Sequence, residues 1–268
     1  MSILELSSFI SKFFPGQDAF NQILNVQGEV YRSVANRRTL RVELGGQGFF
    51  FKVHKGVGWK EIAKNLLHFR LPVTGARNEW LAIRRLEELN IATMKIAGFG
   101  ERGIPPARLQ SFLITDELIN TVSLEDFCRE WPAVPPPAAL KRALIEKVAT
   151  IAKTLHNNGV NHRDFYICHF LLELATLRDP YRVDHLTLYV IDLHRVQIRS
   201  RTPRRWLEKD VAALHFSSMA IGLTQRDRLR FMKAYRDRPL RRILAEEQSF
   251  WQNVERKAQA LYRKGVGA

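Results

Sequence analysis

One short polar segment, residues 161–170, constrains the fold of this chain more than any other, because apolar sequence flanks it on both sides. An apolar pattern of helical period ends just before it, and the apolar run Phe170–Leu172 follows it. Both flanks are expected to be buried, so the turn between them is held rigidly. Because this turn carries His162, Arg163 and Asp164, it is a candidate active site.

Three β-rich runs predict a small antiparallel sheet nearer the N-terminus. The runs are residues 28–32, 39–44 and 49–53, with turns marked by Asn36 and by Gly45–Gly48.

The first turn of this sheet, residues 33–38, lacks the Gly-x-Gly-x-x-Gly pattern of a nucleotide-binding loop. It carries Arg37 and Arg38 instead, whose charges would suit phosphate groups. An ordinary hairpin tip explains these two arginines about equally well.

Lys52 lies in the third run between apolar neighbours, where an unpaired ammonium group would carry a large desolvation cost. It therefore needs an acidic partner. Residues 59–70 and 77–89 have helical periodicity, and Glu79 near the start of the second helix is the candidate. Taken alone, Lys52 reads as an edge-strand side chain reaching solvent and Glu79 as a solvated first-turn carboxylate. Their order along the chain favours the pair.

The second half of the chain reads as mainly helical. Prolines between 132 and 137 indicate a surface loop, and residues 138–157 form a long amphipathic helix that leads into the 161–170 segment. An apolar strand at 186–191 runs directly into Asp192, and residues 243–262 are expected to form one closing helix.

Asp210 opens an apolar helical run, where a carboxylate commonly caps the first turn. The preceding stretch, residues 195–209, is strongly basic and includes Arg195, Arg199 and Arg201. Such a charge run is about equally well explained as solvated surface or as the lining of a site for an anionic acceptor.

Composition narrows the class of partner. At 268 residues the chain is long enough for two lobes, and its net charge of +15 favours an anionic partner or substrate surface. Two cysteines are too few for a disulfide framework or a cysteine-based zinc site. The sequence has neither a signal-peptide pattern nor an apolar run of transmembrane length, so a cytoplasmic location is expected.

The ordered set of residues resembles the two-lobed protein kinases and, more closely, the bacterial lipopolysaccharide core heptose(I) kinases. The resemblance covers nearly the whole length and is carried by residues 49–59, 75–80, 161–170, 191–195 and 209–210. It implies an α+β kinase-like fold, with an N-lobe at residues 1–117 and a mainly helical C-lobe at 118–268. The implied reaction transfers the γ-phosphoryl group of ATP, with Mg²⁺, to a heptose of the lipopolysaccharide inner core.

The resemblance also implies roles for single residues. Asp164 would be the general base, Asp192 a Mg²⁺ ligand, and Lys52 a contact to the nucleotide phosphates that Glu79 orients. His169 stands where protein kinases place an Asn metal ligand, which leaves a second metal ion open.

Other positions have weaker expectations. Asp116 and Glu117 end a predicted strand at 111–115, where a kinase hinge would meet adenine, although a plain strand exit fits equally well. The kinase-like role of Asp210 is to brace the catalytic loop. Acceptor contacts are expected from the arginines at 163, 195, 199 and 201.

Several alternatives stay open from sequence alone. The acceptor could be another small molecule or a protein side chain, or the chain could keep a kinase-like shape without turnover. A nucleic-acid partner is not expected, because most aromatic residues fall on core-facing stripes. The expected partners are the nascent acidic glycolipid at the cytoplasmic face of the inner membrane and, from the excess basic charge, a small acidic protein such as acyl carrier protein.

Overall fold

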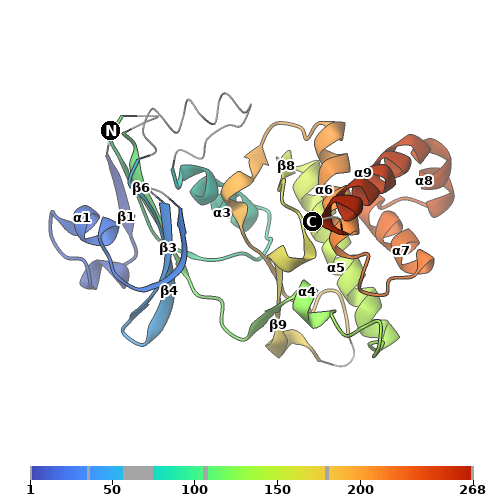
Figure 1. Cartoon of the computed structure of the whole chain (residues 1–268), viewed down its shortest axis with the longest axis horizontal. Helices are drawn as coiled ribbons and strands as arrows, with labels where there is room; N and C mark the ends of the chain where they lie inside the picture. Colours follow the sequence, from blue (N-terminus) through green and yellow to red (C-terminus); the bar gives the residue numbers. More distant parts are fainter. Residues whose placement is uncertain (1, 35–36, 57–74, 105–107, 179–180, 267–268) are drawn as a thin grey trace. The chain divides into compact units, whose positions relative to one another are not determined.

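The computed structural model describes residues 2–34, 37–56, 75–104, 108–178 and 181–266. The chain divides into two compact units (Figure 1). The first comprises Met1–Arg85 with Met94–Ile119, and the second comprises Leu86–Thr93 with Asn120–Ala268. The functional boundary expected between residues 117 and 118 remains a prediction. The predicted turn at Asn36 and the predicted helix at 59–70 lie outside the described residues.

The first unit is built on an antiparallel six-stranded sheet of order β1-β5-β6-β4-β3-β2. Its strands are β1 Ile3–Leu6, β2 Glu29–Val34, β3 Arg37–Leu44, β4 Gln47–His54, β5 Ile96–Arg102 and β6 Gln110–Asp116. The three predicted β-rich runs and the strand at 111–115 are present. Arg37 and Arg38, however, belong to strand β3, so the prediction that both lie in the turn is wrong.

Aromatic packing holds the helices of this unit on its sheet. The short elements η1 Ile10–Lys12 and α1 Ala19–Leu24 precede the sheet, and α3 Arg77–Glu88 begins in this unit. The ring of Phe20 lies 5.2 Å from that of Phe112, and Trp80 stacks on Phe99 at 4.5 Å. This packing anchors the first turn of α3, which carries Glu79.

The second unit is mainly helical, in agreement with the expected kinase-like class. The long helix packs against α7, and α6 packs against α9 (Figure 1). The helices are α4 Leu124–Phe127, α5 Ala138–Asn157, α6 Arg204–Ser217, α7 Gln225–Arg236, α8 Leu240–Glu246 and α9 Gln248–Val266, with 3-10 turns η2 Ile167–His169, η3 Leu174–Thr176 and η4 Leu193–Arg195.

Two small sheets frame the candidate catalytic loop. Their strands are β7 Thr121–Ser123, β9 Phe170–Glu173 and β10 Leu188–Val190 in one sheet, and β8 Val160–Asn161 with β11 Gln197–Ile198 in the other. Within the described part of the chain, none of the helices combines the length and hydropathy that a membrane span requires.

Two helix predictions need correction. Asp210 does not open a helix, because α6 already begins at Arg204, after Pro203. The basic residues at the start of α6 have good helix propensity, although they show no apolar periodicity. The closing helix predicted at 243–262 is two helices, α8 and α9, which are separated at Glu247.

Gly159 ends the long helix in a backbone conformation that a side chain would not tolerate. Its φ is +77°, and a Cβ atom at this position would lie 1.7 Å from the carbonyl oxygen of Arg199. Arg199 donates its backbone N–H to the carbonyl oxygen of Gly159 at 2.9 Å. This close approach sets the start of strand β8, from which the candidate catalytic loop leaves.

Candidate active site

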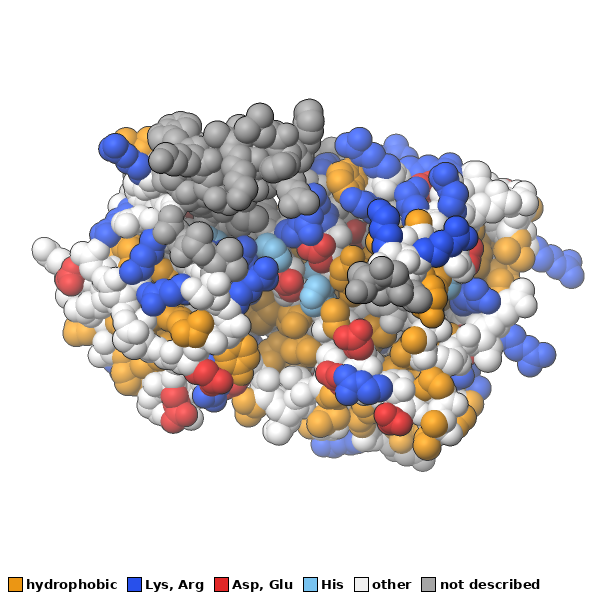
Figure 2. All heavy atoms as spheres, viewed as in Figure 1, with side chains coloured by type: hydrophobic (Ala, Val, Ile, Leu, Met, Phe, Trp, Pro, Cys, Tyr) orange, Lys and Arg blue, Asp and Glu red, His pale blue; other side chains and the backbone are white. Residues whose placement is uncertain are grey.

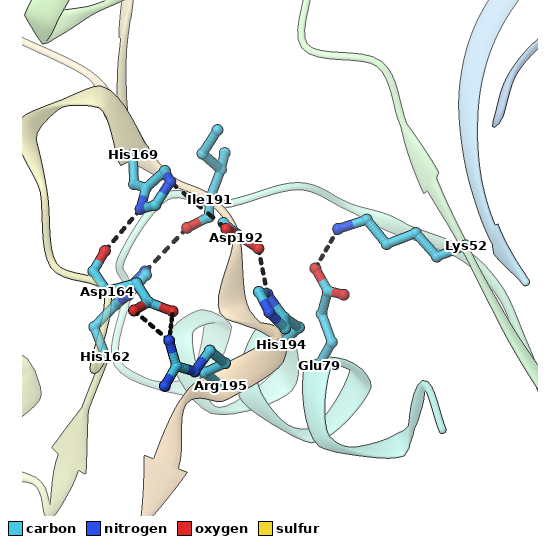
Figure 3. A network of polar contacts seen from close by, with 9 residues as sticks. All are labelled: Lys52, Glu79, His162, Asp164, His169, Ile191, Asp192, His194 and Arg195. Carbon is cyan, nitrogen blue, oxygen red and sulfur yellow. Dashed lines mark hydrogen bonds and ion pairs between the residues drawn. The ribbon is translucent and has the colours of Figure 1, made fainter. Parts of the chain in front are cut away.

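Lys52 and Glu79 form the predicted ion pair within the first unit. Lys52 points from β4 and its Nζ atom lies 2.5 Å from Oε1 of Glu79 on α3 (Figure 3). Glu79 is 3% exposed. A buried carboxylate is costly without a partner, so the pair holds both side chains in fixed positions. The role of Lys52 in contacting phosphate groups stays a prediction.

Asp210 holds the backbone of the candidate catalytic loop. Its carboxylate is 1% exposed and accepts the backbone N–H groups of His162 at 2.6 Å and Arg163 at 2.9 Å. Arg163 has φ +75°, a strained value for a residue with a side chain, and these hydrogen bonds help to fix it. His156 contacts the same carboxylate at 3.3 Å. The contacts match the expected bracing position of Asp210, and the capping alternative is wrong because Asp210 lies well inside α6.

His162 anchors the loop to the strand that ends at Asp192. Its Nε2 atom donates to the carbonyl oxygen of Ile191 at 2.9 Å (Figure 3). Burial lowers the pKa of His162, so the imidazole is kept neutral. The neutral ring stacks on Phe165 at 5.4 Å and on His169 at 5.8 Å.

Asp164, the candidate base, is already paired with an arginine. The Nη1 atom of Arg195 donates to both of its carboxylate oxygens, at 2.7 and 3.0 Å (Figure 3). The Asp164 side chain is 15% exposed and Arg195 is 43% exposed. A carboxylate has about four acceptor positions, so a hydroxyl donor can be added without losing this pair.

His169 is fixed in one tautomer by the same loop. Its Nδ1 atom donates to the backbone carbonyl of Asp164 at 2.7 Å, which orients the ring so that Nε2 points away from this carbonyl. Nε2 lies 3.5 Å from Oδ2 of Asp192 (Figure 3). The imidazole and the carboxylate therefore lie next to each other at the end of the loop.

Asp192 contacts histidines through both of its oxygens. Oδ1 contacts Nδ1 of His194, and Oδ2 faces His169. The backbone of Asp192 is left-handed, with φ 59°. His194 was not among the predicted site residues. A sequence signal for it was present, since it stands where protein kinases have the glycine of the Asp-Phe-Gly triplet.

The residues fit a magnesium ion that has few protein ligands. No group of three or more His, Cys, Asp or Glu ligands gathers among the described residues. Mg²⁺ is commonly held by one or two carboxylates together with substrate phosphates and water. Asp192 suits this chemistry. The imidazole of His169 is a less typical ligand for Mg²⁺, which prefers oxygen.

The predicted nucleotide hinge has its own internal contacts. Glu117 donates its backbone N–H to Gly48 at 3.0 Å, and its carboxylate accepts from Arg41 at 2.7 and 2.8 Å. The hydrogen bond from Arg41 holds the pKa of the Glu117 carboxyl below its ordinary value, whereas burial raises the pKa of Asp116. The predicted contact of Asp116 and Glu117 with adenine stays a prediction.

The remaining predicted arginines fall into three settings. Arg38 reaches the carbonyl oxygen of Leu24 at 3.4 Å, and Arg37 opens strand β3. Arg199 donates to Oδ1 of Asn161 at 2.6 Å, which ties β11 to the candidate catalytic loop. Arg201 is exposed in the segment before α6. The structure thus brings some of the predicted residues together: Lys52 and Glu79 form a pair in the first unit, and the residues around Asp164 form a loop cluster in the second. Five predicted residues in the described part of the chain lie outside both groups: Arg37, Arg38, Asp116, Glu117 and Arg201.

Comparison with known proteins finds relatives along nearly the whole chain. The model of the lipopolysaccharide kinase (Kdo/WaaP) family matches residues 21–235. The lipopolysaccharide core heptose(I) kinase WaaP of Pseudomonas aeruginosa is 52% identical over 97% of this chain and 96% of its own length. The protein of the same name from Escherichia coli K12 is 49% identical over 98% of this chain and 100% of its own length.

A solved structure gives the same result for the fold. The structure of WaaP in complex with acyl carrier protein superposes with a TM-score of 0.83 at 48% identity, covering 97% of this chain and 99% of that one. The expected resemblance and the expected kinase-like fold are both confirmed. The chain belongs to the lipopolysaccharide kinase (Kdo/WaaP) family.

Proposed function

We propose that this protein transfers the γ-phosphoryl group of ATP to a heptose hydroxyl of the lipopolysaccharide inner core. The observation that carries the proposal is the near full-length identity of about half of the residues to relatives named as heptose(I) kinases. The residues that phosphoryl transfer requires occur in this chain in kinase order, and their local contacts suit the assignment.

Phosphoryl transfer asks the protein for positioning and charge stabilisation rather than covalent chemistry. Lys52, oriented by Glu79, would neutralise charge on the phosphates of ATP. Asp192, with His169 beside it, would hold Mg²⁺, which supplies further charge neutralisation at the phosphates when bound. The protein would thereby stabilise the charge that develops on the transferred group.

Asp164 would accept the proton of the attacking heptose hydroxyl. Arg195 holds this carboxylate through both oxygens, and Asp210 fixes the backbone that carries it. General-base help of this kind contributes about 10² to 10⁴ in rate. The rigid loop matters because a poorly oriented carboxylate would lose most of that gain.

The same proposal includes location and partners. The acceptor glycolipid is acidic and membrane-bound, so we propose peripheral binding at the cytoplasmic face of the inner membrane, favoured by the net charge of +15. We also propose acyl carrier protein as a partner, because a relative was solved as WaaP in complex with acyl carrier protein. An acidic protein suits the basic surface of this chain.

A panel of acceptors tests the proposal. The purified protein is incubated with ATP and Mg²⁺ and, in parallel, with core glycolipid, aminoglycosides and peptides, and products are identified by mass spectrometry. The expected result is one phosphoryl group added to the core heptose, with fragment ions that locate it. Efficient transfer to peptides or aminoglycosides with none to the core would replace this proposal with another kinase activity.

A further inference from the structure

Cationic side chains surround the indole ring of Trp206 in the first turn of α6. The distances from the ring centroid are 5.3 Å to Cζ of Arg163, 5.9 Å to Cζ of Arg199, 5.3 Å to Cζ of Arg205 and 5.1 Å to Nζ of Lys209. These four cations and Trp206 are called the Trp206 cluster below. Each contact is a cation–π interaction, but one ring cannot neutralise four positive charges.

Among the residues that the structure describes, no ion pair links a cation of the Trp206 cluster to an Asp or Glu. Neighbouring carboxylates are already engaged: Asp164 pairs with Arg195, and Glu208 pairs with Arg204 and Lys257. The cluster therefore carries an excess of positive charge beside the candidate base.

The arrangement is unfavourable by itself. Arg205 and Lys209 lie four residues apart on α6, a spacing at which like charges repel each other. Burial lowers the pKa of Arg163 and the nearby charges of Arg195 and Arg199 lower it further, although the carboxylates of Asp164 and Asp210 act in the opposite direction. A bound anion would offset the repulsion between these cations. The described residues provide no ion pair that would do so in its place.

Hydrogen-bond donors are also in excess here. Asn161 Nδ2, Arg163 Nε and Trp206 Nε1 are buried atoms with no acceptor in the described part of the chain. Asn161 is fully buried, and its Oδ1 atom is occupied by Arg199. Buried donors of this kind are rare in native proteins and call for an explanation. An oxyanion supplies both the negative charge and the acceptors that the cluster lacks.

The cluster is open to a ligand from solvent. Arg205 and Lys209 are exposed, and Trp206 and Arg199 are half-buried. Figure 2 shows Lys and Arg side chains gathered over the part of the helical unit where α6 and α9 lie in Figure 1. Arg163 directly precedes Asp164, so the cluster includes a side chain of the candidate catalytic loop.

We propose that the Trp206 cluster binds an oxyanion of the acceptor glycolipid, a carboxylate or phosphate close to the heptose that is phosphorylated. The inference rests on the proposed function and adds to it a specificity site: acceptors that lack this anion bind weakly. Arg205 and Lys209 contact the anion, and Arg163 and Arg199 hold the inner side of the cluster.

The test compares two double variants that remove the same charge. Arg205→Gln with Lys209→Gln removes the two exposed cations of the cluster. Arg241→Gln with Arg242→Gln is the matched control, because both arginines are exposed on α8, far along the sequence from the loop. Steady-state transfer is measured as a function of acceptor and of ATP, at low and at physiological salt.

The cluster variant is expected to raise the KM for the core acceptor about tenfold to a hundredfold, as expected for the loss of one or two charge-assisted contacts. Its KM for ATP stays within about twofold, and the control changes neither value beyond a general salt effect. If both double variants raise the acceptor KM equally, or neither does, the inference is wrong while the proposed function stands.

Modified acceptors identify the anion. Reducing the sugar carboxylates of the core to alcohols removes one candidate, and enzymatic dephosphorylation of the lipid portion removes the other. Only the modification that deletes the bound anion should raise the acceptor KM of the wild-type protein. The same modified acceptor should leave the KM of the cluster variant unchanged, because this variant has already lost the contact. A KM that ignores both modifications contradicts the proposal.

A second readout does not depend on turnover. The indole ¹⁵N–H resonance of Trp206, assigned with Trp206→Phe, is followed while glucuronate or inorganic phosphate is added to the protein. A saturable shift in the wild type that is lost in the cluster variant supports the site, and no shift with either anion overturns it. This titration keeps the inference testable even if transfer to the core acceptor fails.

Discussion

Replacing Asp210 tests whether its carboxylate holds the catalytic loop. The carboxylate is 1% exposed and accepts two backbone N–H groups, from His162 at 2.6 Å and Arg163 at 2.9 Å. Asp210→Ala leaves both donors buried without an acceptor. At about 1–3 kcal/mol for each orphaned donor, the expected loss in the free energy of unfolding is about 2–6 kcal/mol.

A graded variant separates hydrogen bonding from packing. Asp210→Asn keeps one carbonyl oxygen, so it should lose about half as much, near 1–3 kcal/mol. Because the left-handed backbone of Arg163 is held by the same contacts, both variants should also loosen the loop that carries Asp164.

Urea unfolding followed by tryptophan fluorescence gives the free energies, and amide hydrogen exchange at His162 and Arg163 reports the loop directly. Both amides should exchange faster in the order wild type, Asp210→Asn, Asp210→Ala. Asp184→Ala is the control, because this exposed carboxylate forms its ion pairs with Arg182 and His185, away from the loop in the sequence. If Asp210→Ala is as stable as the control and leaves the two amides protected, the account of the loop is refuted.

The remaining predictions concern the Lys52–Glu79 ion pair, a glycine and a thiol. Lys52→Met leaves the buried Glu79 carboxylate unpaired and should cost about 3–5 kcal/mol in the free energy of unfolding. The double variant Lys52→Met with Glu79→Gln should recover part of this loss in a urea titration, and equal stability of the single and double variants would contradict the pairing. Gly159→Ala should destabilise the chain, because φ is +77° and the added Cβ would meet the Arg199 carbonyl; an unchanged thermal midpoint would argue against that geometry. Burial raises the pKa of the Cys128 thiol from 9.0 to about 12, so at pH 8 its alkylation should be about a thousandfold slower in the folded than in the unfolded protein, as measured by peptide mass spectrometry against Cys128→Ser. Since the folded state holds this proton more tightly, the associated stability is complete below pH 9 and is lost as the pH rises toward 12; equal alkylation rates in both states would refute the burial.

Regular patterns in the sequence predicted the long elements well. The apolar stripe from 138 to 157, bounded by prolines and by Gly159, corresponds to α5 as found. The ion pair between Lys52 and Glu79 was also predictable, because a buried ammonium group needs an acidic partner. The order of residues in protein kinases then identified Glu79 as that partner.

Features that depend on tertiary contacts were missed. Strand β1 is a four-residue edge strand whose residues are all exposed or only half-buried, so its sequence carries little periodic signal. The start of α6 was misplaced because its first turns are basic rather than apolar. The Arg41–Glu117 pair and the Trp206 cluster join residues that are distant in sequence, and local patterns contain no information on such pairings.

The most direct test of the central claim is phosphoryl transfer to purified core glycolipid by Asp164→Asn. The substitution keeps the shape of the side chain and removes the charge that accepts the hydroxyl proton. Single-turnover transfer should fall by about 10² to 10⁴, while ATP binding and the thermal midpoint stay near the wild-type values. Transfer at close to the wild-type rate by this folded variant would contradict the assignment of Asp164 as the base.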